Sequence, residues 1–182
     1  MSQRNTLVRS LHDVGLAAWF GGSLMGAIGL NGAAAEARDP RERLELSSAG
    51  WGRWAPVNAL AIGAHVVGGI GLLGGNKARL AQQPETQANT SIKTALTVAA
   101  VLTTAYSGMQ GAKVAKHADE GGAGATDPRP GASRKLRKAQ RRLRLAQWAI
   151  PALTGTIVVL SAQQGEQQRP AAGVLRGMKR RH

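Results

Sequence analysis

The chain has 182 residues and carries 24 lysines and arginines against 10 aspartates and glutamates, a formal net charge of +14 at pH 7. Because it contains no cysteine, the composition excludes a disulfide framework, a thiolate metal site and a cysteine nucleophile. Aromatic residues make up only 3% of the chain, so it lacks the stacking platforms on which single-stranded nucleic acid binds. No nucleic-acid partner is expected, and the positive charge is attributed to the loops of a membrane protein.

Four segments of membrane-spanning length contain no Asp, Glu, Lys or Arg: residues 14–35, 54–76, 94–112 and 145–164. At about 1.5 Å per helical residue, about twenty residues cross the hydrocarbon core of a bilayer, which is about 30 Å thick. All the charged side chains lie outside these segments, which explains a mean hydropathy of only −0.19 for the whole chain.

This distribution predicts an all-α fold, an antiparallel four-helix bundle integral to the membrane, with Gly/Ala-rich packing. A soluble bundle is the alternative, but helices of that length would carry charges on their outer faces, and these segments carry none. We expect one membrane domain over residues 1–182, with a basic connector at 113–144. For the first segment, a secretory signal peptide cleaved at Ala33–Ala35 is disfavoured, because its apolar run is too long for a signal core and further spans follow.

Small residues at helical spacing predict close packing of the first two spans. Ala18, Gly22 and Gly26 share one helix face, and the last two form a GxxxG pair, which lets membrane helices approach closely. In the second span, small residues also lie four apart, and the glycines of these pairs are Gly63, Gly68, Gly71 and Gly75. The spacing leaves open whether the packing partner lies in the same chain or in another subunit.

Polar residues within the spans predict a polar interior or a ligand contact, because such groups need partners in lipid. Asn58 and His65 lie seven residues apart, on nearly the same face of one helix. Thr103, Ser107 and Gln110 lie on one face of the third span. For His65, we expect a neutral ring hydrogen-bonded to Thr103 or Ser107. A metal or haem ligand, a proton relay and a substrate contact remain as alternatives.

A basic amphipathic segment directly precedes the fourth span and is expected to continue into it as one helix. Ser133 is the expected N-cap, and an apolar stripe follows, formed by Leu136, Ala139, Leu143 and Ala146. The basic residues around the stripe are Arg134, Lys135, Arg137, Lys138, Arg141, Arg142 and Arg144. They are expected to contact anionic lipid headgroups or an acidic partner. The composition of residues 121–133 predicts a flexible loop.

The first connector, residues 36–53, is expected to hold a turn at Asp39-Pro40 and a short surface helix. Trp51 and Trp54 are placed in the headgroup region, where indoles are favoured, and Pro56 in the first turn of the second span. Because the basic segment abuts a span, the positive-inside rule places the first and third connectors in the cytoplasm and both termini outside.

His12, followed after six residues by Trp19-Phe20-Gly21-Gly22, resembles the opening of bacterial CopD-like membrane domains. The resemblance is confined to these residues and implies a polytopic helical bundle and copper handling. Against copper, the methionines form no close ladder of the soft ligands that Cu(I) prefers. His12 and His65 are the candidate metal ligands, and two histidines do not by themselves establish a site.

No enzymatic activity and no cofactor are expected, because the sequence contains no hydrolase, kinase or nucleotide motif. The leading hypothesis is an accessory or scaffold subunit of a bacterial inner-membrane complex, whose partners are membrane lipids and another membrane protein or a second copy. The alternative is a small transport protein, or a metal- or haem-handling protein, that uses the polar interior. No span contains Asp or Glu, which argues against a carboxylate-driven transporter.

Overall fold

The computed structural model describes residues 6–75 and 84–167, and all regular elements in these ranges are helical. In chain order they are α1 (Thr6–Met25), the π-helix η1 (Gly26–Leu30), α2 (Asn31–Ala35), α3 (Pro40–Gly75), α5 (Pro84–Ala115), the 3-10 turn η2 (Ala118–Glu120) and α6 (Arg134–Gln167). Since α1, η1 and α2 follow one another directly, they form the first of four long helices. The predicted all-α four-helix bundle is confirmed.

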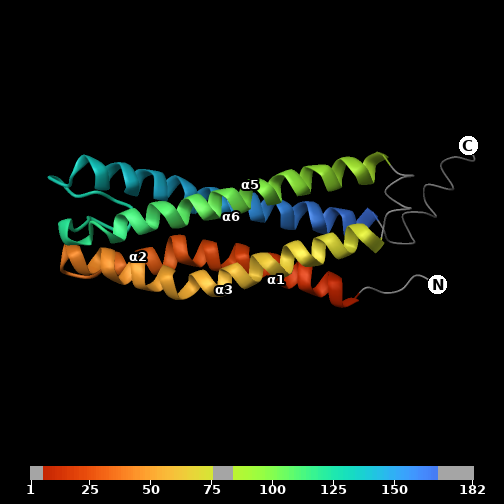
Figure 1. The fold of residues 1–182 in the computed structure, drawn as a ribbon, viewed down its shortest axis with the longest axis horizontal. Coiled ribbons are helices and arrows are strands. Elements are labelled where there is room, and N and C mark those ends of the chain that lie inside the picture. The colour runs from red at the N-terminus through yellow and green to blue at the C-terminus, as the bar shows by residue number, and fades with distance from the viewer. Residues whose placement is uncertain (1–5, 76–83, 168–182) are drawn as a thin grey trace, which may run out of the picture.

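The four long helices lie side by side along the longest axis of the molecule and alternate in direction (Figure 1). Their most extensive contacts are between α1 and α3 and between α5 and α6. Across these two pairs, α1 packs on α6, whereas α3 and α5 contact each other less. We call the end at which α2 meets α3 and α5 meets α6 the connector end, and the other the terminal end.

Three of the described helices are long and apolar enough to cross a membrane: Thr6–Ala35, Pro40–Gly74 and Arg134–Gln163. The chain is therefore a multi-pass membrane protein. The predicted span at residues 94–112 lies within α5, which is not among these helices. Threonine, serine and glutamine side chains lower its hydropathy.

The second helix begins fourteen residues earlier than the predicted span, since α3 runs from Pro40 rather than from Trp54. Asp39 caps it, because its Oδ1 accepts a hydrogen bond from the backbone N–H of Arg41 at 2.8 Å, and proline is favoured in a first helical turn. The expected turn before Pro40 is present, but the helix that follows it is not a short surface helix, because it continues without a break into the second span. Pro56 lies inside the helix instead of at its start, where it removes one backbone hydrogen bond.

The GxxxG pair of the first span packs within the chain, against two tryptophans of α3. A Cβ atom on Gly22 would collide with the indole of Trp54, and one on Gly26 would collide with the indole of Trp51. Both indoles therefore lie over glycines of the first helix, and their expected place in the headgroup region stays a prediction. The large side chain on one helix fits the missing side chain on the other.

Other glycines show where α1 and α3 approach most closely. A Cβ atom on Gly68 would lie 2.5 Å from the backbone nitrogen of His12, and one on Gly71 would lie 2.6 Å from the side chain of Val8. Gly63 has nothing within 4 Å of its Cβ position, so it takes no part in packing within the chain. Gly75 ends α3, and its surroundings lie outside the described part.

Two clusters of buried apolar side chains hold the bundle together. The middle cluster comprises Trp19, Ala61, Ala100 and Ile150, with Ala18 packed against it. The second cluster lies at the connector end and comprises Leu44, Val114, Ala132, Leu136, Ala139 and Leu143. The latter lies beyond the charge-free part of α6, so the bundle continues as packed structure past the expected membrane boundary.

Candidate functional site

A cavity of about 390 Å³ lies among the four long helices on the connector-end side of the middle cluster. Its walls are mostly apolar and small, with glycines and alanines of α3 and α5 on facing sides. Of the predicted interior residues, Asn58 and Ser107 line it. Several of the lining glycines and alanines of α3 and α5 are exposed at the surface of the bundle, so the cavity opens between these two helices.

The predicted threonine of the interior is replaced by its neighbour. Thr104 lines the cavity and its Oγ1 accepts a hydrogen bond of 3.2 Å from Nε1 of Trp19. Thr103 instead donates to the carbonyl of Ala99 on its own helix at 2.7 Å and lines a shallow groove between α5 and α6. Gln110 is buried, as expected, but does not line the cavity.

A side chain that the sequence analysis missed, Asn31, ties three helices together beside the cavity. Its Oδ1 accepts hydrogen bonds from Oγ of Ser47 at 3.1 Å and from Nε1 of Trp51 at 3.0 Å. Its Nδ2 donates to Oε1 of Gln147 on α6 at 2.8 Å. Asn31 follows the π-helix at Gly26–Leu30 directly, and the wider turn there changes the face on which the following residues lie. The sequence feature that could have identified Asn31 is that it is the single amide side chain in an otherwise apolar segment.

Two polar atoms at the cavity are buried without a hydrogen-bond partner, Oδ1 of Asn58 and Nε1 of Trp54. Both residues line the cavity. They lie four residues apart on α3, and so on one face of the helix. Among the described residues that line the cavity, these two atoms are the buried side-chain atoms without a hydrogen-bond partner.

His65 is buried at the α1–α3 contact, away from this cavity. Its Nδ1 lies 3.1 Å from the carbonyl oxygen of His12, and its Nε2 lies 3.4 Å from Oγ1 of Thr97 on α5. The expected hydrogen bonds to neighbouring helices are present, but the partners are not Thr103 or Ser107.

The two candidate metal ligands come together, because the rings of His12 and His65 lie against each other, tilted by 39°, with their centroids 4.2 Å apart. Nδ1 of His12 also lies 2.9 Å from Oδ1 of Asp13. Among the residues that the structure describes, no group of three or more His, Cys, Asp or Glu side chains is arranged to hold a metal ion.

The basic segment is the first part of α6, and it is packed as predicted. Ser133 caps the helix, its Oγ accepting a hydrogen bond from the backbone N–H of Leu136 at 3.1 Å. All four residues of the predicted apolar stripe are buried, and all seven basic side chains are exposed. We call α3 from Pro40 to Arg53, together with residues 116–144, the cap.

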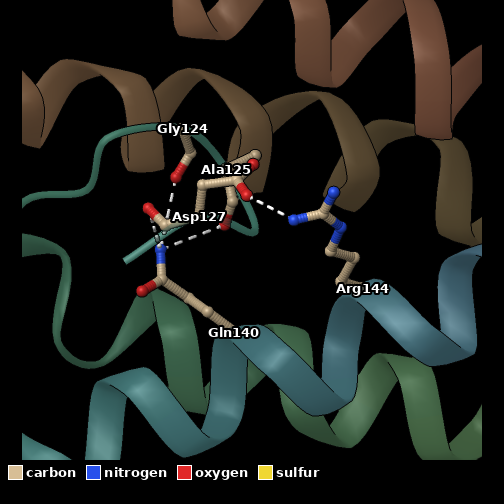
Figure 2. Close-up of polar contacts among 5 residues, drawn as sticks. All are labelled: Gly124, Ala125, Asp127, Gln140 and Arg144. Carbon is tan, nitrogen blue, oxygen red and sulfur yellow. Dashed lines mark hydrogen bonds and ion pairs between the residues drawn. The ribbon is translucent and has the colours of Figure 1, made fainter. Parts of the chain in front are cut away.

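The loop of the cap is ordered by its own polar contacts, which corrects the expectation that residues 121–133 are flexible. The fully buried Gln140 donates through Nε2 toward the carbonyls of Gly124, Ala125 and Asp127 at 3.2, 3.4 and 3.3 Å (Figure 2). Arg144 adds an ion pair with the Asp127 carboxylate at 2.7 Å. The carbonyls of Gly124 and Asp127 also accept hydrogen bonds from backbone N–H groups of the loop, and the glutamine adds a side-chain donor that ties all three carbonyls to α6.

A second contact, between Glu120 and the start of α6, makes the loop sensitive to acid. Oε2 of Glu120 accepts a hydrogen bond from the backbone N–H of Ser133 at 2.6 Å. This bond to the charged carboxylate lowers the pKa of Glu120 below its usual value. Since the folded-state pKa is the lower one, the stabilisation is complete above the pKa of the unfolded chain and is lost as the pH falls through the folded-state value.

We therefore expect residues 118–133 to lose protection from backbone hydrogen exchange on acidification through this range, after correction for the intrinsic exchange rate. Glu120→Gln should show the reduced protection already at neutral pH, because a neutral amide accepts a weaker hydrogen bond. Protection that is equal in both proteins at every pH would contradict a role for this carboxylate.

No family model, curated protein or solved structure matches the chain. The resemblance of residues 12–22 to CopD-like domains therefore stays a prediction.

Proposed function

We propose that the protein is a non-enzymatic accessory or scaffold subunit of a bacterial inner-membrane complex, and that the basic face of its cap binds an acidic segment of a partner protein. The observation that supports this most directly is a row of seven exposed cations on a helix that is buried along its opposite side. Of these cations, Arg144 forms the one ion pair seen within the described residues of the cap.

The height of the cap favours a protein partner over lipid headgroups. The charge-free part of α6 begins at Leu145, so Arg134 stands eleven residues, or about 16 Å, further along the helix axis. The attraction of an anionic membrane surface fades within about 8–10 Å at physiological ionic strength. The headgroup layer itself extends about 5 to 7 Å beyond the hydrocarbon core, so Arg134 and Lys135 stand about one screening length above it and are attracted to the membrane surface less than Arg141, Arg142 and Arg144 are.

Charge reversal at the upper end of the basic face tests the proposal. The triple variant Arg134→Glu, Lys135→Glu, Lys138→Glu should lose a partner that co-purifies with the native protein, because attraction becomes repulsion. Arg38→Glu, Arg41→Glu, Lys116→Glu is the matched control, with the same charge change at exposed positions of the same end. Partner recovery should fall at least about tenfold in the first variant, and little in the control.

The absence of native cysteine allows a second readout, in which a photo-crosslinker is attached to the single cysteine of Arg137→Cys. Mass spectrometry of the adduct in native membranes should give a protein adduct with an acidic peptide at the crosslink. A lipid adduct, or equal partner recovery from both triple variants, would overturn the proposal.

The alternative function, small-molecule transport or metal or haem handling, rests on the bundle interior. The paired rings of His12 and His65 would be its metal site, and the described residues there do not form a group of three or more His, Cys, Asp or Glu side chains arranged to hold a metal ion. The cavity described above is lined by residues other than these two histidines, and a ligand bound in it would not require the partner proposed at the cap.

A further inference from the structure

We propose that the cavity is a binding site for an uncharged, mainly aliphatic molecule with one hydroxyl group, which enters from the lipid between α3 and α5. The volume of about 390 Å³ is at the small end of the range for ligand-binding cavities. Walls that are mostly apolar and include no charged side chain favour an aliphatic chain and offer no counter-ion to a charged headgroup.

The hydroxyl requirement follows from the two unpartnered atoms on α3. Asn58 is 8% exposed, and its buried Oδ1 has no hydrogen-bond donor. Nε1 of Trp54, one turn away, has no acceptor. A hydroxyl group can donate to the first and accept from the second. A ketone or ether could only accept, and would leave the Asn58 carbonyl unpaired in a low-dielectric site.

The route of entry follows from the unequal packing of the bundle. Because α3 and α5 contact each other less than the other neighbouring helices do, the cavity reaches the surface on this side. The residues at the opening are small and exposed, Ala55 and Ala59 on α3 and Gly108 and Ala112 on α5. An aliphatic molecule dissolved in the bilayer can therefore reach Asn58 without crossing a charged surface.

The test uses bromine quenching of tryptophan fluorescence, since Trp51 and Trp54 line the cavity. The probes are 10-bromodecan-1-ol and its methyl ether, titrated into the purified full chain at one fixed detergent concentration. We expect saturable quenching by the alcohol, with an affinity about five- to tenfold higher than that of the ether, the range of one net hydrogen bond. Asn58→Leu should keep the size of the side chain and abolish the difference between the probes.

Gly108→Phe provides a second variant, which puts a large side chain at the opening of the cavity, where nothing lies within 4 Å of the Cβ position of Gly108. It should abolish saturable quenching by both probes, whereas Gly21→Phe, which also meets open space, should leave quenching intact. Equal affinities for alcohol and ether in the native chain would overturn the proposal. So would non-saturable quenching that is the same in all variants, as expected for partitioning into detergent or for a cavity filled by water.

Discussion

Replacing Asn31 with alanine is expected to lower the free energy of unfolding by about 2 to 4 kcal/mol. The substitution removes three hydrogen bonds at once and leaves Nε1 of Trp51 and Oε1 of Gln147 without partners. A hydrogen bond between membrane helices contributes about 0.6 kcal/mol on average and up to about 1.7. Leaving buried groups unpaired raises the total above the simple sum of three such bonds.

The measurement is an unfolding titration with SDS in mixed micelles, followed by circular dichroism. Thr156→Ala is the control, because the Thr156 hydroxyl is exposed and bonds only to its own helix, at the carbonyl of Ala152; it should change stability by less than about 0.5 kcal/mol. In a double-mutant cycle with Gln147→Ala, the two losses should be less than additive. An Asn31→Ala protein as stable as the control would show that the three contacts are energetically neutral.

The second large effect is expected from a single added methyl group, in Gly15→Ala. A Cβ atom there would collide with the carbonyl oxygen of Ala61 and lie 2.6 Å from the backbone nitrogen of His65. Because both neighbours are backbone atoms of α3, no side-chain rotation can relieve the contact, and α1 and α3 must separate. Overpacking of this kind destabilises by about 1 to 3 kcal/mol, and the rigid neighbours place Gly15→Ala at the upper end.

Gly21→Ala is the matched control on the same helix, since nothing lies within 4 Å of its Cβ position. It should be neutral or stabilising by up to about 1 kcal/mol, because alanine is the better helix former. Gly15→Ala is thus predicted to lower the SDS unfolding midpoint, and Gly21→Ala to leave it unchanged or raise it. Similar midpoints would mean that the α1–α3 contact is looser than the structure shows.

Most of the architecture could be predicted from the distribution of charge, because charge-free segments of spanning length have few alternatives. The ends of the helices were harder to predict from the sequence. Asp39-Pro40 is both a turn signal and a helix start, and only packing of the amphipathic cap against Leu136 makes it the start of α3. The loop at residues 121–133 was misjudged for a similar reason, since its order depends on Gln140, which is distant in sequence.

The site was predicted in part, because spacing identifies a helix face but not the helix that lies opposite. Asn58 and Ser107 line the cavity, whereas Thr103 is displaced by Thr104, one residue away. Such a shift rotates a helix by about 100°, and tertiary packing decides it. Gly15 shows the same limit, because its position seven residues before Gly22 places it on nearly the same helix face but does not show that the α3 backbone lies against it. The π-helix before Asn31 turns this residue toward the bundle interior, and the local sequence contains no pattern that predicts a π-helix.

The uninterrupted course of α3 and α6 has a mechanical consequence. Both helices run from the cap into the membrane without a loop at the boundary. Each of them therefore connects the cap rigidly to the membrane-spanning part of the bundle. A sideways force on the cap has no hinge there to absorb it. Each helix contains one internal proline, Pro56 in α3 and Pro151 in α6, at which a missing backbone hydrogen bond makes bending easiest. These prolines lie just below the boundary, at the level of the cavity walls, so we expect a bend imposed at the cap to change the shape of the cavity.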